Sequence, residues 1–245
     1  MVGWVFTDPT HQTNRKDAMS GFVELFTEFN VLGAVGMTIR LSLLTMFFSL
    51  TVGAFIAILR VSPIKVFQRF AAGWISLTVN LPLTLIAFFC FFALFLLLGL
   101  KILPNSALNT QHAFAWGVVS LSFYHSAFVA EGIRSGINTI PLGQAEAARA
   151  IGLTFTQSLS QVILPQAIRG AVAPLANVAN TIVKNTTVLA TVSVSELSTL
   201  MQEMLELRID LLFPIFLTMA GIFVALTLPM GIFLTWLSQK VAVLR

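Results

Sequence analysis

The sequence has few charged residues for its length. Only 10% of its 245 residues are Asp, Glu, Lys or Arg, whereas a soluble domain carries about 25%. Two long stretches, 70–100 and 211–239, contain none of these residues. Apolar runs of about 18 or more residues are typical of membrane-spanning helices. The scarcity of charge therefore argues against an ordinary soluble fold and predicts an all-α, multi-pass protein of the cytoplasmic membrane, in contact with lipid.

Other chemical features are also missing. Cys90 is the single cysteine, so no disulfide can form within the chain and no Cys/His cluster indicates a metal site. The chain has no GxxxxGK[ST] phosphate-binding loop, so we expect no ATPase site and no bound cofactor. No signal-peptide pattern precedes the first apolar stretch, and we expect the first membrane helix to direct insertion. The net charge is +4, and the basic residues lie beside the apolar runs. This placement indicates membrane orientation rather than nucleic-acid binding.

Five membrane spans are predicted from the apolar runs. They cover about 33–59, 74–100, 113–133, 171–193 and 212–237. The fourth is the weakest by composition, because it contains Pro174, Asn177, Asn180 and Lys184. An odd number of spans places the two chain ends on opposite sides of the membrane.

The charged residues between the spans indicate which side each loop occupies. One set of loops, 60–73, 134–169 and 240–245, has one acid, Glu146, and eight basic residues: Arg60, Lys65, Arg69, Arg134, Arg149, Arg169, Lys240 and Arg245. The opposite set has four basic residues and eight acids: Asp8, Asp17, Glu24, Glu28, Glu196, Glu203, Glu206 and Asp210. Because cytoplasmic loops are enriched in Lys and Arg, we expect the N-terminus outside and the C-terminus inside.

The same pattern divides the chain into two regions. Residues 1–32 are expected to form an extracytoplasmic N-terminal segment, and residues 33–245 a single transmembrane domain with a cytoplasmic loop at about 134–169. Within the domain, the stretch 196–210 alternates acids with Leu and Met at helical spacing. This spacing fits an amphipathic helix on the outer surface or an ordinary solvated connector. Residues 21–32 have the composition of a similar short helix.

The cytoplasmic loop carries strong helix signals. Pro141 is placed to begin a helix, the Ala-rich run 142–151 favours its continuation, and Gly152 is placed to end it. Thr154 and Gln157 then have capping-box spacing for a second helix. The residues alone predict a compact pair of short helices, which serves equally well as a connector or as a docking element.

The loop also resembles a known motif. The pattern is Glu-Ala-Ala, three residues, Gly, nine residues, Ile, any residue and Leu-Pro, and here it reads Glu146-Ala147-Ala148, Gly152, Val162 and Leu164-Pro165. It is similar to that of the permease subunits of ATP-binding cassette (ABC) importers in the polar amino acid branch. The resemblance implies the type I importer permease fold, with the loop acting as the coupling helix. By this resemblance Glu146, Ala147, Ala148 and Gly152 are the contacts with the ATPase.

The resemblance extends over most of the chain. Stretches 124–144 and 183–197 resemble family signatures, and "EGIRSGINT" and "GQAEAARAIGL" are similar to glutamate importer permeases of actinobacteria. One departure is Val79, which stands where the family usually has Arg before Asn80. The family implies a cytoplasmic subunit that uses ATP, a second permease subunit, identical or homologous, and an extracytoplasmic substrate-binding protein.

Several polar residues lie inside predicted spans, where they are costly and usually face a cavity or a partner. Lys184 has two interpretations: it lines a substrate path, where a cation suits an acidic amino acid, or it bonds to helix carbonyls or to Glu131. Arg40 lines the path or extends its side chain to the membrane surface. Glu131 is placed to pair with Arg134, three residues on. The full set of candidate path residues is Lys184, Asn185, Thr187, Asn80, Thr84, Arg40 and Glu131.

The leading hypothesis is a permease subunit that imports a polar amino acid, glutamate being favoured, by alternating access coupled to a separate ATPase. The alternative is a secondary transporter or channel driven by an ion gradient. That alternative predicts several intramembrane carboxylates and no docking loop, and only Glu131 is available. A membrane-embedded enzyme would need a nucleophile–base or metal cluster near one membrane face, and the sequence shows none.

Overall fold

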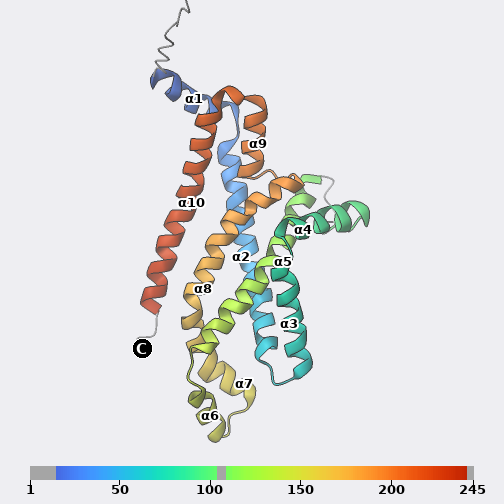
Figure 1. The fold of residues 1–245 in the computed structure, drawn as a ribbon, viewed down its shortest axis with the longest axis vertical. Coiled ribbons are helices and arrows are strands. Elements are labelled where there is room, and N and C mark those ends of the chain that lie inside the picture. The colour runs from blue at the N-terminus through green and yellow to red at the C-terminus, as the bar shows by residue number, and fades with distance from the viewer. Residues whose placement is uncertain (1–14, 104–108, 242–245) are drawn as a thin grey trace, which may run out of the picture.

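The computed structural model describes residues 15–103 and 109–241. Within these ranges the regular elements are all helices and no strand is present. Figure 1 shows an elongated bundle, with α1 (Arg15–Glu28) and α9 (Leu197–Leu207) at one end and α6 (Leu142–Ala150) and α7 (Phe155–Gln157) at the other. The two polar segments predicted on opposite sides of the membrane, 196–210 and 134–169, thus lie at opposite ends of the molecule.

Three of the predicted spans are confirmed as long single helices. They are α2 (Val31–Val61), α5 (Asn109–Asn138) and α10 (Leu212–Val241). An α-helix rises 1.5 Å per residue, so helices of about 30 residues exceed the roughly 30 Å of a hydrocarbon core. Each is long and apolar enough to cross a membrane.

The second predicted span, at 74–100, is broken. Its residues belong to α3 (Lys65–Asn80), to α4 (Leu83–Phe88) and to a π-helical continuation, η1 (Phe89–Leu97). The two arms meet at 103° around Pro82. Proline lacks the amide hydrogen that an α-helix needs and disfavours helical geometry in the residue before it. Residues 15–103 and 109–241 therefore contain four long apolar helices, and a fifth span if the bent pair counts as one.

The fourth predicted span, at 171–193, begins earlier than expected. The helix that starts at α7 continues without a break through η2 (Ser158–Ile163), α8 (Leu164–Asn185) and η3 (Thr186–Val192). Phe155–Val192 is thus one helical segment of 38 residues. Pro165 does not interrupt it: it lies inside the segment, directly after the π-helical turns of η2. The expected second short helix of the loop is therefore the beginning of the fourth span.

The centre of the bundle is α5, which packs against α2 on one side and α8 on the other. Glycines allow these close approaches: a Cβ at Gly53 would meet Val129, and one at Gly136 would meet the backbone of Ala167 and Ala171. Small residues let membrane helices pack at short distance, since lipid offers little hydrophobic force to drive them together.

Two polar elements cover the end of the bundle that holds α1. Of the two alternatives for 196–210, the structure shows a helix, α9, followed by a short turn, η4 (Ile209–Leu211). The short helix expected at 21–32 is α1, which starts earlier, at Arg15. Of the predicted segment 1–32, residues 1–14 lie outside the described residues, as does Arg245 at the other end.

Candidate functional site

The predicted loop forms a capped helical turn at the far end of the bundle. Pro141 precedes α6 with φ −58°. Gly152 follows α6 with φ +86°, in the left-handed region that favours glycine. Thr154 and Gln157 form the expected capping box. These local predictions are confirmed, and together they fix the direction in which α6 leaves the bundle.

The four predicted docking residues are not equivalent in the structure. Glu146, Ala147 and Gly152 are exposed, whereas Ala148 is only 4% exposed. Ala148 therefore packs α6 against the rest of the loop. The sequence reasoning missed two large apolar side chains on either side of Glu146-Ala147-Ala148, namely Leu142 and Ile151, which are 82% and 78% exposed. Large apolar side chains exposed on a polar loop mark an interaction surface, and their position beside Glu-Ala-Ala was the available signal.

A side-chain link joins α6 to the base of α8. The Gln166 side-chain amide donates to Oε1 of Gln144 at 2.5 Å and to the Val162 carbonyl at 2.8 Å. Gln144 lies in α6, and Gln166 lies in the first turns of α8. Because α8 continues into η3, the link connects α6 to a helical segment that runs into the apolar part of the molecule.

The outward surface of α8 carries a polar face at membrane depth. Asn177, Thr181 and Lys184 are all exposed and lie at i, i+4 and i+7, on one side of the helix. The segment belongs to the span Phe155–Val192, and only 22% of an 18-residue apolar stretch of this span is buried in the single chain. Polar side chains at this depth face a cavity or another subunit rather than lipid.

Neighbouring residues show how the candidate path is built. Lys184 and Glu131 do not pair, because Glu131 contacts Arg134 at 2.6 Å, as predicted. Asn185 ends α8 and is hydrogen-bonded to His125 of α5, with 3.1 Å between its Nδ2 and Nε2 of His125. The hydroxyl of Thr187 donates to the Lys184 carbonyl. Lys184 itself thus remains available at the surface of α8.

The residues predicted from the other spans lie in two places. Asn80 and Thr84 are exposed on either side of the break at Pro82, and α4 packs against η3, so the second span approaches the end of α8. Arg40 instead lines a separate cavity of about 600 Å³ with Thr110, Gln111 and Ser195. None of the other candidate path residues lines that cavity.

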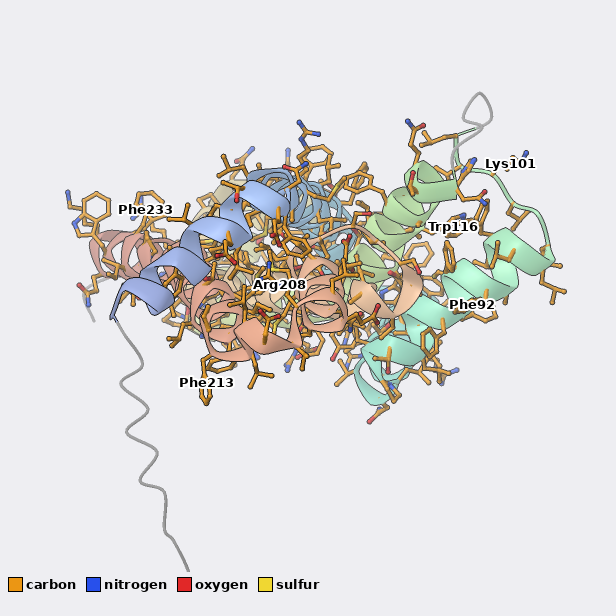
Figure 2. All side chains as sticks on the ribbon, turned by 90° about the horizontal axis from the view of Figure 1, so that it is seen from above. Phe92, Lys101, Trp116, Arg208, Phe213 and Phe233 are labelled. Carbon is orange, nitrogen blue, oxygen red and sulfur yellow. The ribbon has the colours of Figure 1, made fainter. Side chains whose placement is uncertain are left out.

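The end of the bundle that holds α1 contains an ion cluster that the sequence did not reveal. Arg208 contacts Glu28 at 2.6 Å, Glu24 at 2.9 Å and Asp210 at 3.1 Å. Figure 2 shows Arg208 over the middle of the bundle, with the apolar Phe213 and Phe233 at its edge. The hydrogen bonds to carboxylates raise the pKa of Arg208 further above its usual range. The cluster attaches α1 to the segment that leads into α10.

A buried carboxyl group lies at the opposite end of α9 from Arg208. Glu196 is fully buried, and its Oε1 accepts hydrogen bonds from the amides of Ser198 and Thr199 at the start of α9. Its second oxygen has no partner among the described residues. Burial raises the pKa of Glu196 to about 7, although the two amide hydrogen bonds oppose this effect. Among the described residues no group of three or more His, Cys, Asp or Glu side chains is arranged to hold a metal.

Comparison with known proteins identifies the family. Residues 22–243 match the family described as "Binding-protein-dependent transport system inner membrane component". The chain belongs to this family. It is therefore a multi-pass component of the cytoplasmic membrane, the membrane part of a transport system that also contains a binding protein, and we refer to it below as the permease.

The permease has close relatives in sequence. It is 40% identical over 216 residues to the glutamate transport system permease protein GluC of Corynebacterium efficiens. The matched region covers 87% of this chain and 95% of the relative. It is 32% identical over 203 residues to the probable glutamine ABC transporter permease protein GlnM of Bacillus subtilis, covering 83% and 89% of the two chains.

Solved structures agree with the observed fold. The permease superposes on the crystal structure of an amino acid ABC transporter with histidines, with a TM-score of 0.76, 26% identity and coverage of 91% of this chain and 97% of the other. An inward-facing structure of the methionine ABC transporter MetNI gives a TM-score of 0.67 at 19% identity over 87% of this chain and 96% of the other. At that identity the likeness concerns the fold alone.

Proposed function

We propose that the permease is the transmembrane subunit of an ATP-driven importer for a polar amino acid, and that the substrate is glutamate. The observation that carries the proposal is the continuous helical segment Phe155–Val192. It connects an exposed loop, bearing Glu146, Leu142 and Ile151, to the polar face around Lys184. One rigid element thus joins a surface suited to a motor protein with a surface suited to a polar substrate.

The proposed partners follow from the surfaces and from the relatives. A separate cytoplasmic ATP-binding subunit docks on α6, where Leu142 and Ile151 bury their exposed side chains. A second permease subunit, identical or homologous, completes the path, because the polar face of α8 is open in the single chain. An extracytoplasmic binding protein delivers the amino acid to the end that carries α1 and α9, with the N-terminus outside as the loop charges indicate.

In this mechanism, ATP binding closes the ATPase dimer and draws the two coupling helices together. The displacement passes through the Gln144–Gln166 link into α8 and reorients the polar face from one side of the membrane to the other. A ligand shifts such an equilibrium only by its different affinities for the two states. The binding protein and ATP supply that difference from opposite sides of the membrane.

Glutamate is favoured for two reasons. The relative of 40% identity is described as a glutamate transport permease, and Lys184 provides an exposed cation at membrane depth. The relative at 32% identity is described as a probable glutamine permease, so glutamine is the principal competitor. A transporter driven by an ion gradient is less well supported, because Glu131 is already paired with Arg134 and the exposed loop would have no task.

The test is ATP hydrolysis by the complex of the permease and its ATPase, purified together and reconstituted with the binding protein. We expect hydrolysis to be stimulated by glutamate, and by glutamine or other amino acids only at higher concentration. Failure of any ATPase to assemble with the permease would contradict the proposal. Stimulation by glutamine alone would correct the substrate and leave the importer function intact.

A further inference from the structure

A groove with a polar wall lies between α8 and α10. It has a volume of about 550 Å³. Its polar lining is Asn180, Thr227, Thr235 and Gln239, and its apolar lining is Val224, Leu228, Ile232 and Trp236. Gln239 also lines a second cavity of about 520 Å³, which reaches Gln144, Gln166 and Arg169 at the base of the coupling loop. The two cavities share Gln239 and, taken together as the lane, extend from Asn180 in α8 to the base of the coupling loop.

The polar wall is unusual for its surroundings. The span Ile209–Lys240 is the most apolar of the candidate spans, with a mean hydropathy of 2.4. Its residues Thr227, Gly231, Thr235 and Gln239 are nevertheless spaced four apart, which places them along one side of the helix. Phe233 points away from the bundle at the edge of the molecule, as Figure 2 shows. One side of α10 is thus suited to contact with lipid, and another side is suited to contact with water or a polar molecule.

Asn180 provides an independent indication that the groove holds a hydrogen-bond donor. Its side-chain oxygen is buried, with no partner among the described residues, and its amide lies next to Gly231. A buried carbonyl oxygen without a donor costs about 1–3 kcal/mol, and lipid tails offer no donor. Water or the amino group of a substrate satisfies this oxygen.

Cations mark both ends of the lane. Lys184 lies one turn beyond Asn180 on α8, and Arg169 lies at the mouth near α6. Arg169 is exposed and makes no hydrogen bond or ion pair with the described part of the chain. We propose that the groove between α8 and α10 is the water-filled inner half of the substrate path, and that Asn180, Thr235 and Gln239 contact the substrate as it leaves toward the cytoplasm. This proposal rests on the proposed importer function and extends it.

The test is the accessibility of single cysteines in the assembled transporter. The native Cys90 is buried, and its replacement, Cys90→Ser, gives a cysteine-free background. Thr235→Cys and Gln239→Cys then place a thiol in the groove, and Phe233→Cys, on the same helix, is the matched control. The rate of modification by a charged methanethiosulfonate, which reacts in water and does not cross lipid, is measured in inside-out proteoliposomes. Only variants that still assemble with the ATPase are compared.

We expect the two groove cysteines to react at least ten times faster than the control at Phe233, and saturating transported amino acid to slow their reaction. Rates equal to the control would show that lipid or a second subunit fills the groove, and would overturn the inference. Fast reaction without protection by the amino acid would overturn it as well, because the water would then lie outside the path. In each case ATP hydrolysis stimulated by the amino acid, recorded on the Cys90→Ser parent transporter, tests the importer function separately.

Discussion

His125 in α5 and Asn185 at the end of α8 are joined by a hydrogen bond of 3.1 Å between Nε2 and Nδ2. The other ring nitrogen of His125 lies 2.8 Å from the Leu121 carbonyl, so Nδ1 carries the hydrogen and Nε2 accepts from the Asn185 amide. The bond is made where the α-helix narrows into the 3-10 turns of η3. It fixes the backbone immediately after Lys184 against the centre of the bundle.

Replacing His125 by Phe should leave the Asn185 amide unpaired. We expect a loss of about 1–3 kcal/mol in stability and slower uptake, because Lys184 then loses its fixed position. His125→Gln keeps an acceptor for Asn185 and should retain most of both properties. Thermal unfolding in detergent and initial uptake rates measure the two effects. Equal uptake by the Phe and Gln variants would show that the hydrogen bond does not position Lys184.

Gly136 allows α5 and α8 to cross in close contact. A Cβ at this position would collide with the Ala167 carbonyl and lie 2.7 Å from the Ala171 amide nitrogen. Gly136→Ala should therefore destabilise the permease by about 1–3 kcal/mol. Gly73→Ala is the control, since nothing lies within 4 Å of its added Cβ, and it should gain up to about 1 kcal/mol of helix propensity. Similar melting temperatures for the two variants would contradict the packing described here.

Arg208 attaches α1 through Glu24 and Glu28. Arg208→Ala should release α1, so that the backbone amides of residues 22–28 exchange with deuterium faster while those of α5 stay protected. Arg208→Lys keeps the charge but not the planar fork that binds two carboxylates, and should give an intermediate rate. Unchanged exchange in α1 of the Ala variant would show that apolar packing alone holds this helix.

Glu196 makes stability depend on pH. An acid with a higher pKa in the folded chain binds more protons there than in the unfolded chain. The free energy of unfolding therefore falls as pH rises from the ordinary value of 4.5 toward about 7, by about 3 kcal/mol in total. Glu196→Gln keeps a side-chain oxygen for the cap and removes this dependence.

The two proteins should thus have similar melting temperatures near pH 4.5, and the Gln variant should become the more stable one as pH rises to 7. Above that value the difference should stay constant. Glu203→Gln, an exposed position on the same helix, serves as the control and should change little. A constant difference between the Glu196→Gln variant and the native protein across the whole range would show that Glu196 is ionised throughout.

The parts of the fold that depend on neighbours in sequence were predictable. Pro141, Gly152 and the Thr154–Gln157 capping box act within one or two helical turns, so their spacing in the sequence was enough. The Glu131–Arg134 pair was predictable for the same reason. Three of the spans followed from composition alone, because the lipid demands long apolar helices.

Features that depend on distant contacts were not predictable. Pro82 marked a place for a kink, but the bend of 103° is visible only with α3 and α4 placed in the bundle. Arg208 meets Glu24 across 184 residues of sequence, and neither residue carries a local signal of the other. For the same reason Arg40 was predicted to line the substrate path together with Lys184, whereas in the structure Arg40 lines a separate cavity. The polar wall of α10 was hidden because three polar residues, Thr227, Thr235 and Gln239, barely alter the composition of so apolar a helix.

The central claim is that the exposed loop at α6 couples the permease to ATP hydrolysis. Glu146 is exposed on α6 and lies away from the polar face of α8, so its replacement by Lys should leave membrane insertion and folding intact. The direct measurement is ATP-dependent uptake of labelled glutamate by proteoliposomes that contain the permease, its ATPase and the binding protein. The native permease should accumulate glutamate only with ATP, and Glu146→Lys should lose most of this uptake. Full uptake by the variant, or uptake driven by an ion gradient without ATP, would contradict the account.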